Sequence, residues 1–295
     1  MSAGPPGSTW GRAATSAKAR NANSTRSARL AELLHGRTVA YAVVVGSVVA
    51  IVAGAALHSV AVIAGGPAAV ALLVAALALA AADRHAAADF YRAYAAGRGL
   101  AYVGEAALFP LTPLLGAGQR RSFEHWMEGP LAGGRRCDLG HYSFEVQKGH
   151  GPGRSRETPH FTICVVELES GMRLFPGIFL TRRRGLLGAL EGDQWLSNAA
   201  RHEVELESAA LCERCELWVD DDQDDLLLRQ LFVPSFEVLL AEHPLAPCFE
   251  YRAGTLVVYA EHRFEDEGHL DWMLEVTGEI AERFTAEVGQ AAALH

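Results

Sequence analysis

Residues 249–262 read FEYRAGTLVVYAEH, and an acidic stretch follows them from Asp266. Two β-forming segments, at 249–252 and 256–262, flank Ala253-Gly254-Thr255, which predicts a hairpin. Between residues 266 and 288 apolar side chains recur at steps of three and four, which predicts an amphipathic helix. An antiparallel hairpin joined to a helix favours an α+β fold over alternating βαβ units.

The segments upstream of this hairpin are also typical of antiparallel strands and turns. Residues 160–168 (HFTICVVEL) form the strongest strand pattern in the chain. A second hairpin is expected at 124–131 and 138–147, joined through residues 132–136. Further expectations are strands at 203–207 and 211–219, a short helix at 184–190, and a helix over 222–243 that Pro234 interrupts.

The N-terminal third differs sharply from this pattern. Half of the chain is hydrophobic, and from Val39 to Leu79 His58 alone is charged or near-charged. Residues 39–57 and 60–82 form two uncharged runs of the length that crosses a bilayer as helices. We therefore expect an integral membrane protein with a transmembrane helical hairpin at residues 37–83. The turn is expected either at His58-Ser59 or at Gly65-Gly66-Pro67.

The flanks of these runs predict the rest of the organisation. Six basic residues and one Glu lie in residues 1–37, and Arg84, Arg92 and Arg98 follow the second run. The positive-inside rule then places both termini in the cytoplasm, at the inner face of the cell membrane. We expect a disordered basic tail at 1–36, a juxtamembrane helix at 84–100 with Phe90, Tyr91 and Tyr94 at headgroup level, and a cytosolic α+β domain at 101–295.

Two other interpretations of the apolar runs are weaker. A secretory signal peptide is disfavoured because about 37 residues precede the first run and a second run follows it directly. A buried hairpin in a soluble core is disfavoured because two successive uncharged runs are rare in soluble folds.

Charge is distributed unevenly along the remaining chain. Residues 101–202 contain 12 Arg or Lys and 10 Asp or Glu, whereas residues 203–295 contain 5 and 22. The acidic C-terminal half argues against nucleic acid as a partner. Besides the bilayer itself, anionic lipid headgroups are an expected partner. They would contact basic residues that we expect on the membrane-proximal side of the domain. These are Arg120, Arg121, Arg135, Arg136, Arg154, Arg156 and Arg182, Arg183 and Arg184.

Five cysteines, Cys137, Cys164, Cys212, Cys215 and Cys248, form an odd set that favours a reduced compartment. Cys212 and Cys215 form a Cys-x-x-Cys pair, but His202, His243 and His262 lack ligand spacing relative to it. Because the pair lies in an expected strand, a thioredoxin-like redox site is also disfavoured. We expect no metal and no cofactor, with Cys215 packed inward.

Two charged segments have structural explanations. The run Asp220 to Asp225 lacks the glycine and the final glutamate of a calcium-binding loop, and is expected to cap the next helix. The basic loops at 151–156 and 181–185 lack a phosphate-binding glycine pattern. No nucleophile motif is present, although His141, His160 and Asp138 could meet across neighbouring strands.

Several short stretches resemble a family of high-G+C bacterial membrane proteins of unknown activity. They are FYRAYA (90–95) with GL (99–100), GPL (129–131), YSFE (142–145), HFTICVV (160–166), VELES (204–208) and FVP (232–234). The resemblance spans most of residues 86–290. It implies two N-terminal membrane helices and a cytosolic α+β domain, and it implies no particular chemistry.

Two functions remain open from the sequence. The first is a binding or adaptor module held at the inner membrane face, which meets a protein partner or the lipid surface. The second is a membrane-bound enzyme whose active site is assembled only in the folded chain, with no catalytic residue identifiable beforehand.

Overall fold

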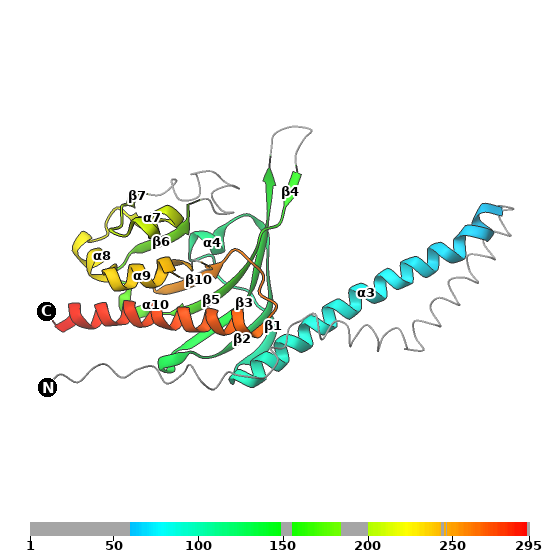
Figure 1. Cartoon of the computed structure of the whole chain (residues 1–295), viewed down its shortest axis with the longest axis horizontal. Coiled ribbons are helices and arrows are strands. Elements are labelled where there is room, and N and C mark those ends of the chain that lie inside the picture. The colour runs from blue at the N-terminus through cyan, green and yellow to red at the C-terminus, as the bar shows by residue number, and fades with distance from the viewer. Residues whose placement is uncertain (1–59, 149–154, 184–199, 243–244, 246, 294–295) are drawn as a thin grey trace. The chain divides into compact units, whose positions relative to one another are not determined.

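The computed structural model describes residues 60–148, 155–183, 200–242, 245 and 247–293 (Figure 1). Contacts divide the chain into two units, one of residues 1–86 with 266–268 and one of residues 87–265 with 269–295. The second unit contains the sheet, its covering helices and all the sites considered below. It is an α+β domain, as the sequence predicts.

The sheet of the second unit is antiparallel and has 10 strands. Their spatial order is β1-β2-β3-β5-β10-β9-β6-β8-β7, and β4 pairs with the end of β3. In chain order they are β1 (Ala101–Glu105), β2 (Gln119–Pro130), β3 (Arg136–Lys148), β4 (Ser155–Glu157), β5 (His160–Glu167), β6 (Gly177–Arg182), β7 (Arg201–Val204), β8 (Cys215–Asp220), β9 (Cys248–Arg252) and β10 (Thr255–Ala260).

The last hairpin lies in the middle of this sheet. β10 pairs with β5 on one side, and β9 pairs with β6 on the other. Of the strands from the first half of the domain, β1 to β5 lie together on one side of the sheet, and only β6 lies among strands of the second half, between β9 and β8.

The turn of this hairpin has two residues, Ala253 and Gly254. Their φ angles are 49° and 78°, and Arg252 pairs directly with Thr255. Positive φ at both central positions matches the right-handed twist of the flanking strands. The predicted hairpin is confirmed, with a turn one residue shorter than expected.

Three helices cover one face of the sheet: α8 (Asp225–Leu231), α9 (Pro234–Glu242) and α10 (Glu267–Ala293) (Figure 1). Phe284 of α10 packs against Phe249 and Tyr251 of β9, with ring centroids 5.8 and 4.8 Å away. Phe236 of α9 also contacts Phe249. The apolar stripe of α10 is buried, so the predicted amphipathic helix is confirmed.

The opposite face carries a second aromatic core. It includes Phe123, Tyr142 and Phe161, and the short helix α4 (Pro113–Gly116) adds Leu114 and Leu115. Side chains alternate between the two faces along each strand. Short 3-10 turns at Ala132–Gly134 and Glu169–Gly171 complete the connections.

The acidic run before α8 caps that helix, as predicted. β8 ends at Asp220, and the carboxylate of Asp224 accepts hydrogen bonds from the backbone N–H groups of Leu226 and Leu227, at 2.7 and 3.2 Å. Pro234 begins α9, which confirms the predicted interruption.

We expect Asp224→Ala to lower the free energy of unfolding by about 1 kcal/mol, because two N–H groups of the first helical turn lose their acceptor. Asp222→Ala is the matched control. This substitution removes the same charge from the same run, but Asp222 does not cap the helix. Chemical unfolding of both variants measures the loss in the free energy of unfolding. Equal losses in the two variants would contradict the capping role of Asp224.

One predicted strand is wrong in its first half. Residues 209–214 form the helix α7 (Ala209–Arg214), and only the following residues belong to β8. The hydroxyl of Ser208 accepts from Leu211 N at 3.3 Å and caps this helix. The cap stabilises a helix at residues 209–214, where the alternation of apolar residues predicts a strand.

The helix α3 (Val60–Arg98) runs without interruption through Gly65, Gly66 and Pro67, which excludes the turn expected at those residues. Gly99, with φ of 71°, ends it. Among the described residues, no helix is long and apolar enough to cross a membrane. Most side chains between residues 60 and 82, and all of residues 39–57, lie outside the described part. The membrane hairpin therefore stays a prediction.

The aromatic residues near the end of α3 do not face lipid headgroups. Phe90, Tyr91 and Tyr94 are each almost fully buried in the domain. The hydroxyl of Tyr94 contacts Asp271 of α10 at 3.0 Å. This corrects the expected headgroup position, because the same stripe of aromatic residues suits either a bilayer surface or a protein core.

Candidate functional site

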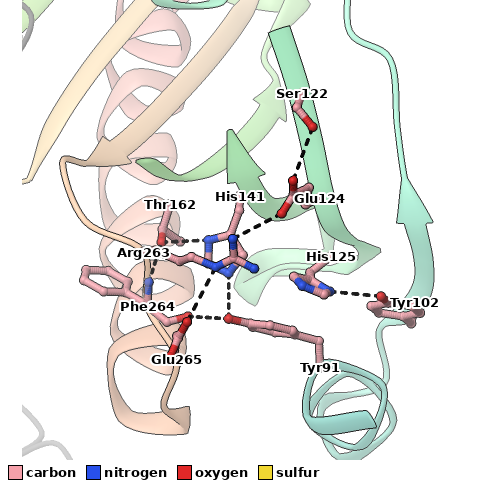
Figure 2. A network of polar contacts seen from close by, with 10 residues as sticks. All are labelled: Tyr91, Tyr102, Ser122, Glu124, His125, His141, Thr162, Arg263, Phe264 and Glu265. Atoms are coloured by element: carbon pink, nitrogen blue, oxygen red, sulfur yellow. Dashed lines mark hydrogen bonds and ion pairs between the residues drawn. The ribbon is translucent and has the colours of Figure 1, made fainter. Parts of the chain in front are cut away.

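A buried polar cluster joins five segments that are distant in sequence (Figure 2). It contains Tyr91 of α3, His125 of β2, His141 of β3, Thr162 of β5 and the backbone of Phe264, which lies between β10 and α10. We call this cluster the polar joint.

His141 lies at the centre of the polar joint. Tyr91 donates its hydroxyl hydrogen to Phe264 O at 2.8 Å, which leaves His141 Nε2 to donate to Tyr91 Oη, also at 2.8 Å. Thr162 Oγ1 lies 3.3 Å from His141 Nδ1 and accepts from Phe264 N at 2.9 Å. Burial lowers the pKa of His141 well below its usual value, and the nearby charge of Arg263 lowers it further. The ring is therefore neutral at neutral pH.

His125 is held by an irregular piece of strand. It lies where β2 shifts register against β3, and its φ is 52°. The ring stacks on Tyr91 with centroids 4.3 Å apart, and Nδ1 lies 3.1 Å from the hydroxyl of Tyr102. Burial lowers the pKa of His125 to about 4, with Arg263 as the second cause. Strained backbone and a displaced pKa are both enriched at functional sites.

The contacts of the polar joint nevertheless favour a structural role. The polar atoms around His141 are bonded to one another, and three hollows on the described surface are lined by other residues. A general base needs a position where a substrate can reach it. Through these contacts, the polar joint fixes α3 and the start of α10 on the sheet.

The residues suggested from the sequence are not assembled into a site. His141 and Asp138 are three positions apart on β3 and point to opposite faces. His160 is exposed and pairs with Ser143. No local pattern connects His141 with Tyr91, because these residues are 50 positions apart and belong to different elements.

A groove lies along residues 202–207 and the helices α8 and α9, with a volume of about 400 Å³. Its carboxylates are Glu203, Glu205, Glu207, Asp225 and Glu237. We call it the acidic groove.

The floor of the acidic groove is apolar. Val204, Leu206, Leu228 and Phe232 line it. The groove also contains His202 and Arg229.

The acidic side chains of this groove are unequally compensated. Arg183 pairs with Glu203 at 3.1 Å, and buried Glu237 accepts from Ser208 N at 2.6 Å. Within the described part of the chain, no cation pairs with Glu205, Glu207 or Asp225. The groove therefore offers negative charge to a ligand.

Two large apolar side chains are exposed on the helices that form the groove. Leu226 of α8 is 65% exposed and Val238 of α9 is 46% exposed. Exposed apolar side chains beside a groove are typical of protein interaction surfaces.

The Cys-x-x-Cys pair is divided between two elements. Cys212 lies in α7 and its thiol contacts Leu206 O at 3.4 Å. Cys215 starts β8, and its buried thiol meets that of Cys248, as the inward packing predicts. The helix-to-strand order is opposite to that of thioredoxin-like sites. Among described residues, no group of three or more His, Cys, Asp or Glu could hold a metal ion; His243 lies outside them.

The described arginines among those expected to face a membrane are dispersed over the domain. Arg120 and Arg156 pair with Glu145, whereas Arg136 pairs with Glu128. These two groups lie at opposite ends of the β2–β3 hairpin, roughly 30 Å apart at the usual rise per residue.

The remaining arginines are also dispersed. Arg135 donates to Thr285, Arg182 donates to Leu245 O, and Arg183 pairs with Glu203. Arg154, Arg184 and the expected helix at 184–190 lie outside the described residues.

Comparison with known proteins finds no relative. No protein family, no curated protein and no solved structure matches the chain. The functional argument therefore depends on the chain's own geometry.

Proposed function

We propose that this protein is a binding module tethered to the membrane, and that its acidic groove captures a basic segment of a partner protein. The observation that carries this proposal is the groove itself, in which Glu205, Glu207 and Asp225, none of them paired with a described cation, share one lining with four apolar side chains. Charge of one sign around a groove steers a partner of the opposite sign and fixes its register.

The spacing of the carboxylates indicates the form of the ligand. Glu203, Glu205 and Glu207 are all exposed, whereas Val204 and Leu206 between them are half-buried. Alternate residues of a strand share one side, at about 6.6 Å spacing; β7 ends at Val204, and Glu205 and Glu207 follow it outside regular structure. An extended ligand with Lys or Arg at alternate positions would place its cations against this row and its apolar side chains on the floor.

The tether is the second part of the proposal. It is supported by the two uncharged runs at residues 39–57 and 60–82 and by the basic flanks that favour cytoplasmic termini. Both the resemblance to bacterial two-helix membrane proteins and the continuous helix α3, which leads from residue 60 into the domain, agree with it. An anchored module meets membrane-bound partners at high effective concentration.

A peptide-binding measurement tests the groove. The full-length protein in lipid nanodiscs is titrated into a fluorescent peptide of alternating lysine and valine. A second peptide has the same composition, with its lysines in one block. We expect tighter binding of the alternating peptide. Replacing Glu203, Glu205 and Glu207 together by Gln should weaken that binding about tenfold or more, because the row of carboxylates that would face the lysines is removed.

The control removes the same charge elsewhere. Glu275, Glu279 and Glu282 lie on α10, outside the groove, and their joint replacement by Gln should leave the affinity nearly unchanged. Equal losses in the two triple variants would mean that only net charge attracts the peptide. Failure of the unmodified protein to distinguish the two peptides would also overturn the proposal.

A further inference from the structure

Strand β7 lies at one edge of the sheet, and its outer side has no neighbour among the described strands. It is also a wall of the acidic groove, which His202, Glu203 and Val204 line. An edge strand presents a row of backbone N–H and C=O groups that can pair with another chain. Which of these groups point outward follows from the pairing of β7 with β8.

A hydrogen bond at the start of β7 decides this orientation. Asp221 N donates to Ala200 O at 2.9 Å, in line with the register of β7 and β8. In an antiparallel pair, residues that exchange backbone hydrogen bonds alternate along the strand with residues that exchange none. Counting from Ala200, His202 and Val204 are the residues of β7 that bond to β8.

Arg201 and Glu203 are the alternate residues, so their backbone N–H and C=O groups point away from β8. Strand β6, on the other side of β8, gives the same answer. Arg183 N donates to Arg214 O at 2.9 Å. Counting by two along that register makes Trp218, which opposes Glu203, bond to β6. Within the described part of the chain, no group is hydrogen bonded to the backbone of Arg201 or Glu203.

The opposite edge of the sheet is built differently. Strand β1 pairs with β2 through two register shifts around Gly104, whose φ is 95°. Such irregularities turn an edge away from other chains. By contrast, β7 pairs with β8 without a shift, so its outward groups keep the regular spacing that an added strand needs.

The side chains at this edge select the partner by charge. Glu203, Glu205 and Glu207 are exposed. Arg201 offers them no compensation, because its side chain is only 3% exposed and pairs with Asp220 at 2.7 Å. Charge on an edge strand also prevents unselective pairing. A second copy of the chain would bring the same glutamates against this edge, whereas a basic strand would be attracted to it.

We infer that the basic partner segment adds to β7 as a further strand of the sheet. The inference rests on the proposed function, since it concerns the same ligand in the same groove. Backbone hydrogen bonds to Arg201 and Glu203 supply affinity, and the side chains in the groove supply specificity, which is the division of roles in strand addition generally. The partner segment is therefore extended and basic, and its own edge is unpaired before it binds.

Backbone N-methylation of the peptide tests the strand addition. Two derivatives of the alternating lysine–valine peptide, one methylated at every lysine nitrogen and one at every valine nitrogen, are titrated against the full-length protein in nanodiscs. In an extended chain the N–H groups of the lysines point to one edge and those of the valines to the other. We expect one derivative to lose affinity about tenfold or more, and the other to bind nearly as well as the unmodified peptide.

Hydrogen exchange resolved to single residues gives a second readout within β7. Binding of the unmodified peptide should slow exchange at the amides of Arg201 and Glu203, which gain acceptors. The amides of His202 and Val204 are the internal control, because they already bond to β8 and should be slowed less.

The outcomes separate this inference from the proposed function. If both methylated peptides bind equally, whether well or poorly, while the alternating peptide is still preferred to the block peptide, strand addition is wrong and the groove remains the binding site. Slow exchange at Arg201 and Glu203 before peptide is added would indicate pairing between two copies of the chain and would contradict a basic partner strand. If the unmodified peptide does not bind, the proposed function and this inference both fail.

Discussion

Replacing Glu250 with Gln is expected to raise the free energy of unfolding at alkaline pH by about 3 kcal/mol and to have a much smaller effect at acidic pH. Glu250 is fully buried on β9, and its Oε1 has no hydrogen-bond partner in the described structure. Burial raises its pKa from 4.5 to about 7, although Leu114 N–H and the hydroxyl of Thr112 act in the opposite direction. The difference between these two pKa values corresponds to about 3 kcal/mol in the free energy of unfolding.

The sign follows from proton binding in the two states. Below about pH 4.5 the carboxyl of Glu250 is protonated in both the folded and the unfolded chain. Its ionisation therefore takes nothing from the free energy of unfolding in that range. As pH rises towards 7, the unfolded chain releases its proton first, so the stability falls. Glutamine stays neutral throughout and keeps an acceptor for Leu114 N.

Chemical unfolding, followed by tryptophan fluorescence at about pH 5 and about pH 8, measures the free energy of unfolding of the variant and of the unmodified protein. The difference between the variant and the unmodified protein should grow as pH rises. A difference that is the same at both pH values would show that Glu250 ionises as readily when folded as when unfolded.

Tyr91→Phe is expected to lower the free energy of unfolding by about 2 to 3 kcal/mol, since two buried groups lose a partner. The missing hydroxyl leaves Phe264 O without its donor and His141 Nε2 without its acceptor. Tyr102→Phe is the control, because that hydroxyl contacts His125 in a partly buried place. The same unfolding assay should show a smaller loss for the control.

Hydrogen exchange adds a readout specific to the polar joint. In Tyr91→Phe, the backbone amide of Phe264 should exchange faster than in the unmodified protein, because the segment between β10 and α10 loses one of its attachments. Equal losses in the two tyrosine variants, or unchanged exchange at Phe264, would contradict the attachment of this segment through Tyr91.

Local patterns were sufficient to predict the elements with strong periodicity. The hairpin of β9 and β10, strand β5 and helix α10 each follow from residues close together in sequence. The capping by Asp224 was equally local. Strand β6 was missed because GIFLTR is a short, continuously buried segment, which has no alternation to distinguish a strand from a helix.

The spatial arrangement depended on interactions that no local pattern contains. The insertion of β9 and β10 between β5 and β6 joins segments about 90 residues apart. The polar joint was missed for the same reason. Glu250 gave a weak signal, since it is a charged residue inside a short strand whose neighbours Phe249 and Tyr251 are strongly apolar.

The central position of the last hairpin also governs when the domain can form. During synthesis, the strands up to β8 are complete well before residues 248–260 emerge, yet β5 and β6 have no partner on their inner edges until then. Unpaired strand edges invite pairing with other chains. The domain is therefore expected to fold slowly, and only after residues 248–260 have been synthesised. Truncation before residue 260 should yield aggregates rather than a smaller native domain.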